Sequence, residues 1–268
     1  MPTFRTGRFQ SIDGIPLRKD TVIMPLFEVC IDSLAGALAA STGGADRVEL
    51  CSGLVEGGIT PGPGLIRHTV ERAGIDCVVL IRPRGGDFLY SGDELLIMED
   101  DIRTVKDTGA HGIATGVLTA EGKVDEDVMS RLIEAARPME VTFHRAFDMT
   151  REPFEALDTL IGLGIDRVLT SGQGRSVLDT LDMIANLVTH ADGRITVMPG
   201  GGVREDNIRE VLERTGAGEV HFTAFSRRES AMEYRNRRPM MGGDSVPGEY
   251  ERIVTDVERV RAFLQAVS

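Results

Sequence analysis

Two short apolar segments near the N-terminus each carry a glutamate followed two residues later by a cysteine. The pairs are Glu28 with Cys30 and Glu49 with Cys51. Side chains two residues apart point to the same face of a strand, so each segment presents a carboxylate and a thiol together. Thiolates are preferred ligands of Cu(I), whereas zinc is usually coordinated by a third and a fourth protein ligand as well. The pattern makes Cys30 and Cys51 candidate ligands of one Cu(I) ion.

The cysteine pair has two other interpretations, which the sequence leaves open. The two thiols would also serve as small buried side chains that fill a core, or as a redox-active dithiol. Cys77, the remaining cysteine, begins an apolar segment and is expected to lie in the core. Three irregularly spaced cysteines do not make a disulfide framework, so we expect free thiols and a cytoplasmic location.

Four ionisable residues near the ends of apolar segments form a candidate catalytic set: Glu28, Glu49, Arg82 and His144. Because burial of an unpaired carboxylate is costly, both glutamates should face a cationic side chain, and Arg82 is the expected counter-charge. A glutamate or His144 would then move a proton while Arg82 holds an anion. The alternative is a structural ion network that ties neighbouring strands together.

Several small or basic residues form a candidate anion site. The loop RPRGGDF contributes a second guanidinium group, and the turns SGQG and GGG contribute backbone N–H groups that can approach an anion closely. The candidate anion-binding residues are Arg84, Ser171, Gly172, Gly200, Gly201 and Gly202. In the alternative interpretation the glycines only form tight turns and the arginine loop is only solvated.

A repeated motif predicts the elements that must position these side chains. It reads GADRV, GIDCV, GAHGI, GIDRV and GAGEV, and its copies begin at Gly44, Gly74, Gly109, Gly164 and Gly216. Each copy follows apolar residues at helical spacing and leads into an apolar run. A glycine with positive φ commonly ends a helix, so each copy marks a helix, a turn and a strand.

Strands alternating with helices along the chain predict a single (β/α)8 barrel of the TIM-barrel type. Eight strands are expected near residues 24–30, 46–51, 77–83, 112–117, 139–144, 166–171, 194–199 and 219–223. Functional groups of such barrels gather at the carboxyl ends of the strands, where the candidate residues stand. An open doubly wound sheet is the alternative, but no GxGxxG follows the first strand. We expect the barrel over 23–268, with an N-terminal extension over 1–22 and an insert before the last helix over 226–249.

The composition excludes several classes of function. The chain of 268 residues has 30 basic and 42 acidic side chains, and its formal net charge is −12. An acidic chain without a basic cluster is a poor partner for a phosphate backbone, so we expect no nucleic acid to bind. No apolar run of about 18 residues occurs, so no contact with a membrane is expected.

Seven segments of the sequence resemble the CutC family of copper homeostasis proteins. They are FEVCIDS from Phe27, GADRVELCSGLVEGGITPG from Gly44, RPRGGDFLY from Arg82, TFHRAFD from Thr142, RVLTSG from Arg167, MPGGGV from Met198 and MEYRN from Met232. The resemblance implies a TIM-barrel-like fold, a cytosolic location, self-association and a role in copper tolerance or trafficking. It also implies that Cys30 and Cys51 are the Cu(I) ligands.

Two functions follow as expectations. The first is a copper homeostasis protein that binds Cu(I) through the two cysteines. The alternative is a TIM-barrel enzyme of unassigned activity on a small phosphorylated or carboxylated metabolite. The insert over 226–249 carries local positive charge and would cover the barrel or pack against a second subunit. We therefore expect a homo-oligomer.

Overall fold

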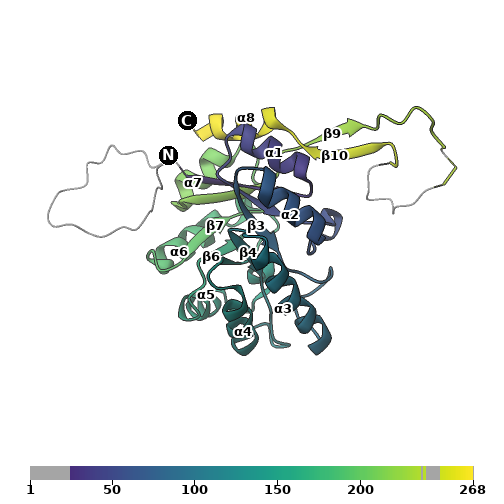
Figure 1. Cartoon of the computed structure of the whole chain (residues 1–268). Helices are drawn as coiled ribbons and strands as arrows, with labels where there is room; N and C mark the ends of the chain where they lie inside the picture. Colours follow the sequence, from purple (N-terminus) through teal and green to yellow (C-terminus); the bar gives the residue numbers. More distant parts are fainter. Residues whose placement is uncertain (1–24, 237, 240–247, 268) are drawn as a thin grey trace, which may run out of the picture.

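Eight parallel strands form a barrel in the computed structural model, which describes residues 25–236, 238–239 and 248–267 (Figure 1). The strands are β1 (Leu26–Ile31), β2 (Arg47–Leu50), β3 (Asp76–Leu80), β4 (Gly112–Thr115), β5 (Glu140–Phe143), β6 (Arg167–Thr170), β7 (Thr196–Pro199) and β8 (Glu219–Phe222). Their order is β7-β6-β5-β4-β3-β2-β1-β8. A parallel bridge between Gly200 and His221 joins the two ends of this order. The predicted TIM-barrel-like fold is confirmed.

Helices surround the barrel on its outer side (Figure 1). They are α1 (Leu34–Gly43), α2 (Pro63–Arg72), α3 (Gly92–Asp107), α4 (Glu126–Ala136), α5 (Pro153–Gly162), α6 (Leu181–Ala191), α7 (Ile208–Thr215) and α8 (Val257–Val267). The first glycines of the five motif copies all adopt positive φ, from 61° to 96°. Two of them, Gly44 and Gly216, are the C-cap residues of α1 and α7, as the motif predicts. None of the helices in the described ranges combines the length and apolarity that crossing a bilayer requires.

The two faces of the strands differ in polarity. Outward side chains such as Val29 and Leu50 are fully buried in the hydrophobic core between the barrel and the helices. The inward face carries a second, smaller cluster made of Cys30, Cys51, Val78, Leu80 and Ala114. Because side chains alternate along a strand, Glu28 accompanies Cys30 and Glu49 accompanies Cys51 on the inward face. The predicted parity of both pairs is therefore correct.

In the register of β1 and β2, the two cysteines do not stand opposite each other. Cys30 stands opposite Glu49, and Ile31 stands opposite Leu50. Cys51 follows the end of β2, and its backbone N–H donates to Ile31 O at 2.8 Å. Neighbouring strands of a barrel are staggered. Since the offset between the cysteines is two residues, both side chains still point inward.

β3 ends at Leu80, earlier than the predicted end at residue 83. The backbone at Arg82 pairs instead with the loop between β2 and α2. Arg82 N–H donates to Thr60 Oγ1 at 2.9 Å, and Thr60 N–H donates to Arg82 O at 2.9 Å. These two bonds join the backbone at Arg82 to the loop between β2 and α2 and fix the position of Arg82 at the rim of the barrel.

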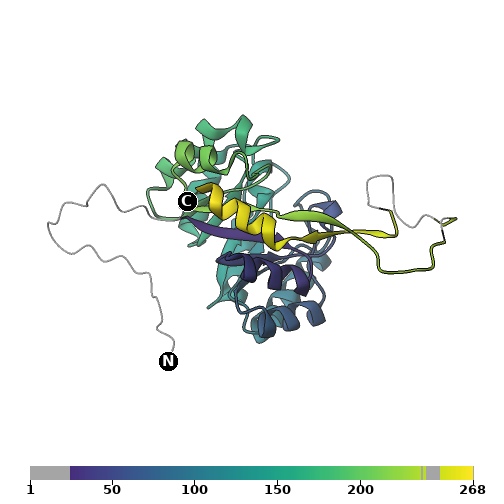
Figure 2. The same cartoon turned by 90° about the horizontal axis from the view of Figure 1, so that it is seen from above.

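The predicted insert over 226–249 overlaps the first strand of an antiparallel pair and ends just before the second. The two strands are β9 (Phe225–Glu229) and β10 (Glu251–Thr255). This hairpin leaves the barrel between β8 and α8 and extends away from it, so it does not cover the barrel (Figure 2). The predicted extension over residues 1–22 and the middle of the insert, residues 240–247, lie outside the described residues.

Candidate functional site

A cavity of about 300 Å³ opens at the carboxyl ends of the barrel strands. Its ionisable lining residues are Cys30, Glu49, Glu56, Arg82, His144, Arg145, Asp148 and His221. Its larger apolar lining residues are Leu80, Phe88, Met149 and Leu169. Three of the four candidate catalytic residues therefore share one cavity. The fourth, Glu28, is two residues before Cys30 on the same inward face and is 1% exposed.

Cys30, Glu49 and Cys51 form a compact buried cluster. The two Sγ atoms lie 3.8 Å apart, and Cys51 Sγ lies 3.4 Å from Glu49 Oε2. One ligand atom from each residue lies within 4.8 Å of the other two. Twice a metal–sulfur bond of about 2.3 Å exceeds the sulfur–sulfur separation, so a single ion can contact both sulfurs. Both cysteines are free thiols, and the donor set fits a soft ion such as Cu(I).

The two thiols differ in acidity because one donates a hydrogen bond to the other. The Cys51 hydrogen bond stabilises the Cys30 thiolate and, with His221 and against the effect of burial, lowers the pKa of Cys30 to about 6. The same hydrogen bond, together with burial, raises the pKa of Cys51 well above 9. Burial raises the pKa of Glu49 to about 8 despite the nearby charge of His221. Near neutral pH the cluster thus holds one thiolate, one thiol and a carboxylic acid.

His221 connects this cluster to Glu28. Its Nδ1 lies 2.8 Å from Glu28 Oε1, and its Nε2 lies 3.9 Å from Glu49 Oε2. Burial lowers the pKa of His221, but the hydrogen bonds to Cys30 and Glu28 outweigh it and hold the pKa well above 6.5. A carboxylate on one imidazole nitrogen is the usual way in which proteins orient a histidine toward a metal. Glu28 therefore positions His221, whose other nitrogen faces the thiol cluster.

A network of buried ion pairs lies below the cavity. Arg47 Nε donates to Glu28 Oε2 at 2.5 Å, and Arg47 Nη2 donates to Glu219 Oε2 at 2.5 Å. Arg167 Nε reaches Glu219 Oε2 at 2.5 Å, and Arg167 Nη2 reaches Glu140 Oε2 at 3.2 Å. Burial raises the pKa of Glu28, but Arg47 and the His221 hydrogen bond outweigh it and lower the pKa to about 2. The structural ion network that the sequence left as an alternative is thus present at this level.

The expectation that Arg82 neutralises Glu28 and Glu49 is wrong. Arg82 Nη1 donates to the backbone oxygens of Glu56 and Gly58 at 2.9 and 2.8 Å, and Arg82 Nη2 donates to Gly86 O at 2.8 Å. The guanidinium group also lies over the Phe88 ring, 5.1 Å from its centroid. Because the β2–α2 loop and the loop after β3 hold it at the rim, Arg82 does not reach the glutamates, and Arg47 neutralises Glu28 instead.

His144 is buried and uncharged at the end of β5. Its Nδ1 accepts a hydrogen bond from the Ala146 backbone N–H at 3.2 Å, and its ring lies 5.0 Å from the Phe88 ring. Burial and the charge of Arg82 lower the pKa of His144 to about 3. A neutral imidazole whose Nδ1 accepts must carry its proton on Nε2. His144 is therefore a hydrogen-bond donor at the wall of the cavity.

The predicted anion-binding residues lie outside the lining of this cavity. Arg84 is bound by Glu94 at 2.6 Å and by Asp87 at 3.2 Å, and its guanidinium group lies over the Tyr90 ring. The turn after β6 holds a carboxylate of the chain itself: Ser171 N–H donates to Asp148 at 3.0 Å, and Gln173 N–H donates to it at 3.2 Å. Gly172 N–H donates to Thr170 Oγ1 at 2.8 Å.

The three glycines after β7 allow two loops to pack closely. A Cβ at Gly200 would lie 2.5 Å from the Leu169 side chain, and a Cβ at Gly202 would lie 2.5 Å from Ser176 Oγ. Gly201, with φ of 100°, accepts a hydrogen bond from Val177 N–H at 2.9 Å. The tight-turn interpretation accounts for these contacts, and binding of an external anion at Gly200, Gly201 and Gly202 stays a prediction.

Arg47 and Arg167 are functional neighbours that sequence reasoning missed. Both occupy the fourth position of the repeated motif, in GADRV and GIDRV. Stepping back two residues from Glu49 along β2 gives Arg47, which therefore shares the inward face. The signal was present, but it lay at the start of the strands, whereas barrel chemistry is sought at their ends.

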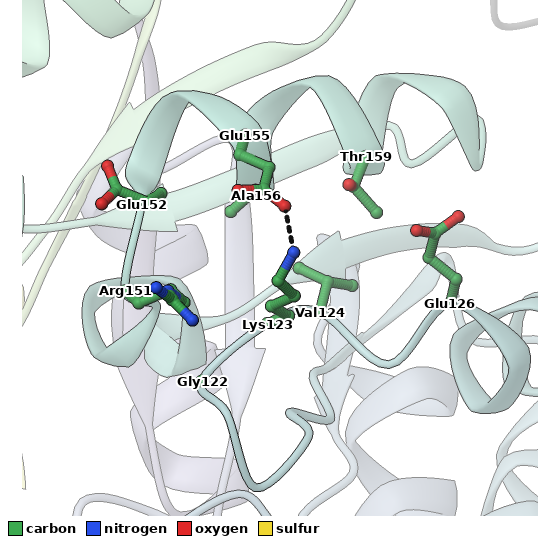
Figure 3. A pocket seen from close by; sticks show the side chains of 9 residues that line it. All are labelled: Gly122, Lys123, Val124, Glu126, Arg151, Glu152, Glu155, Ala156 and Thr159. Carbon is green, nitrogen blue, oxygen red and sulfur yellow. Dashed lines mark hydrogen bonds and ion pairs between the residues drawn. The ribbon is translucent and has the colours of Figure 1, made fainter.

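A smaller hollow lies on the outer side of the barrel, between the loop before α4 and the start of α5 (Figure 3). Lys123 Nζ is bound there by Glu155 Oε1 at 2.6 Å, and both side chains are about half exposed. An exposed pair of this kind contributes about 0–1 kcal/mol to stability. The hollow has none of the buried donors or thiols found at the barrel mouth.

Comparison of the sequence with known proteins identifies a family and several close relatives. A family model described as the CutC family matches residues 25–226. A copper homeostasis protein cutC homolog from Homo sapiens is 49% identical over 238 residues, which are 89% of this chain and 87% of that protein. A family protein CutC from Mesorhizobium japonicum is 47% identical over 251 residues, 94% of this chain and 97% of that protein.

Solved structures agree with this assignment. The CutC structure from Streptococcus agalactiae superposes with a TM-score of 0.71 at 33% identity and covers 74% of this chain and 98% of its own. A phosphoribosylanthranilate isomerase from Pyrococcus furiosus superposes with a TM-score of 0.52 at 16% identity, covering 91% of this chain and 98% of its own. At that identity the second likeness shows the barrel fold alone.

Proposed function

Since the chain belongs to the CutC family, we propose that it is a copper homeostasis protein that holds one Cu(I) ion between Cys30 and Cys51. The observation that supports the proposal most strongly is the 3.8 Å separation of the two sulfurs inside the barrel. Relatives named for copper homeostasis cover most of this chain, which is why copper is the ion considered.

The surroundings of the sulfurs support a soft monovalent ion. Cys30 and Cys51 pack against Val78, Leu80 and Ala114, so the ion would be held away from water. The nearby oxygen of Glu49 belongs to a carboxyl group whose pKa burial raises to about 8, so it adds no full negative charge at neutral pH. A weakly charged, sulfur-rich and dry site favours Cu(I) over harder divalent ions. The residues of this chain would bind the ion as cargo and shield it from solvent.

We expect anaerobic titration against a competing Cu(I) chelator to give one Cu(I) per chain and, at pH 7, release of about one proton. Cys30, whose pKa is about 6, is already a thiolate at this pH. Cys51, whose pKa lies well above 9, must lose its proton to bind. Calorimetry in two buffers with different ionisation enthalpies measures the number of protons.

The apparent affinity for Cu(I) should fall as the pH is lowered. Below about pH 6 Cys30 is protonated as well, so the ion must displace two protons and the apparent affinity should fall more steeply with acidification. A chain that yields all its Cu(I) to the chelator, or that binds the ion without releasing a proton at pH 7, contradicts the proposal.

The enzyme alternative has less support. Of the residues expected to move a proton, Glu49 belongs to the cluster that fits the metal. Burial and the charge of Arg82 lower the pKa of His144, the other expected proton carrier, to about 3. In addition, the glycine turns expected to hold a phosphate lie outside the cavity lining. The copper proposal uses the buried thiols directly and needs no further group.

We also propose that the protein is cytosolic, in keeping with its free thiols.

We propose, in addition, that the β9–β10 hairpin contacts a second copy of the chain. A two-stranded hairpin is marginally stable in water by itself. This one exposes Ile253 and presents Arg227 and Arg228, whereas the whole chain has a net charge of −12. The arginines complement an acidic neighbour. Sedimentation velocity should show a dimer or larger species at micromolar concentration, and a monomer alone would refute the contact.

A further inference from the structure

The cavity contains a buried positive charge that the copper proposal does not use. Arg82 is 7% exposed, and in the part of the chain that the structure describes no carboxylate lies within ion-pair distance of its guanidinium group. Its guanidinium group donates three hydrogen bonds to neutral backbone oxygens, and its Nε has no partner among the described residues. Keeping a charge buried without a counter-ion is costly, so an anion beside Arg82 would stabilise this arrangement.

A second unpartnered donor lines the same cavity. His144 is 4% exposed, and its Nε2 has no hydrogen-bond partner among the described residues. Since its Nδ1 accepts from Ala146 N–H, Nε2 carries the proton. A buried donor left without an acceptor is destabilising, and such groups mark places where a ligand or ordered water belongs. The missing partner of His144 is an acceptor oxygen.

The other charged groups of the cavity are already compensated. Asp148 accepts hydrogen bonds from Arg145 Nε at 2.7 Å and Thr170 Oγ1 at 2.5 Å, besides those from the turn after β6. The imidazole of His221 is paired with Glu28. Glu56, which also lines the mouth, is exposed to solvent. Arg82 therefore remains the one buried charge without a partner among the described lining residues.

We propose that the cavity binds a small organic carboxylate, whose oxygens pair with the Arg82 guanidinium group and accept a hydrogen bond from His144 Nε2. The apolar part of this molecule would contact Phe88 and Leu169, which also line the cavity. A volume of about 300 Å³ limits the ligand to a small molecule. This proposal goes beyond copper binding, and the groups that would bind the carboxylate are Arg82 and His144, not the thiols.

A carboxylate fits better than a phosphate monoester for two reasons. One unpaired guanidinium group balances a single negative charge, whereas a phosphate monoester carries about −1.5 to −2 at pH 7. The neutral His144 adds a hydrogen bond but no charge, because burial and Arg82 hold its pKa near 3. The aromatic and aliphatic lining also favours a ligand with an apolar portion.

The test uses the full metal-free chain and three probes in calorimetric titrations: benzoate, benzamide and inorganic phosphate. Benzoate should bind at one site per chain. Benzamide, which has nearly the same shape but no charge, and phosphate should each bind at least about tenfold more weakly, since a charge-assisted hydrogen bond contributes about 1.5–3 kcal/mol. Phosphate binding tighter than benzoate binding would overturn the assignment of a carboxylate.

Variants locate the site. Arg82→Met and His144→Gln should each weaken benzoate binding by about tenfold or more, and His144→Gln keeps the proposal testable if Arg82→Met fails to fold. Arg84→Met is the matched control, because Arg84 lies on the same loop but is paired with Glu94 and Asp87 outside the cavity. No saturable benzoate binding, or equal binding by the Arg82 and Arg84 variants, would overturn the proposal.

Discussion

Replacement of either Cys30 or Cys51 by serine is expected to lower the Cu(I) affinity by more than about 100-fold. Groups that only orient a metal ligand contribute about 10–100-fold to affinity, and each of these thiols is a ligand itself. The loss should be similar for both variants because the sulfurs lie 3.8 Å apart and would share one ion. Anaerobic competition with a chromophoric Cu(I) chelator measures the affinity of each variant.

Cys77→Ser supplies the matched control for this experiment. Cys77 is 3% exposed, so its burial resembles that of the other two cysteines, but it belongs to the core between the barrel and the helices. Burial raises the pKa of its thiol to about 12, which leaves it an inert core residue. The variant should keep one Cu(I) per chain with unchanged affinity. A loss as large as that of the Cys30 and Cys51 variants would show that copper binds elsewhere.

Replacement of Arg47 by methionine is expected to lower the free energy of unfolding by about 3–5 kcal/mol, the usual effect of removing one partner from a buried ion pair. Arg47 contacts Glu28 and Glu219, and its side chain is 3% exposed. Among the described residues, the variant leaves Glu28 with His221 as its remaining side-chain hydrogen-bond partner. For a chain of this size the melting temperature should fall by roughly 6–20 °C, which calorimetry or circular dichroism can measure.

The same variant should change how stability depends on pH. The Glu28 carboxyl group has a pKa of about 2 in the folded chain, against 4.5 in a model compound. Between these values the unfolded chain binds a proton that the folded chain does not, so this group stabilises the fold above pH 4.5 and loses that effect as the pH falls toward 2. Without Arg47 the pKa rises, and the loss of stability in this interval should become smaller.

Arg103→Met is the matched control for Arg47→Met. Arg103 also contacts two carboxylates, Glu99 at 3.2 Å and Asp100 at 2.5 Å, but its side chain is 58% exposed on α3. Exposed ion pairs contribute about 0–1 kcal/mol, so this variant should unfold nearly as the unmodified chain does. Equal destabilisation by the two variants would contradict the role given to the buried network.

The barrel could be predicted from the sequence because its helices and strands are specified by residues close together in the chain. The repeated glycine motif ends helices and begins strands through backbone geometry that needs no distant partner. Period-two alternation likewise placed Glu28 with Cys30 and Glu49 with Cys51 on the inward face. These predictions needed only the residues within each element.

The parts that could not be predicted depend on contacts between elements. The register that sets Cys30 opposite Glu49 arises from the stagger of neighbouring strands in a closed barrel. The partner of Glu28 depended on the direction of a long side chain: Arg82 is turned toward Glu56 and Gly58, which lie far from it in the sequence. The spacing of residues along the chain determines neither the register of β1 and β2 nor the partner of Glu28.

Copper binding in this protein rests on the two barrel thiols, which we propose hold one Cu(I) ion. Copper K-edge X-ray absorption of the full chain loaded anaerobically with one equivalent tests it most directly, because it identifies the atoms bonded to the metal. Two sulfur neighbours are expected, both lost in the Cys30→Ser, Cys51→Ser double variant and retained in Cys77→Ser. A first shell made only of nitrogen and oxygen, or a sulfur signal unchanged in the double variant, would contradict it.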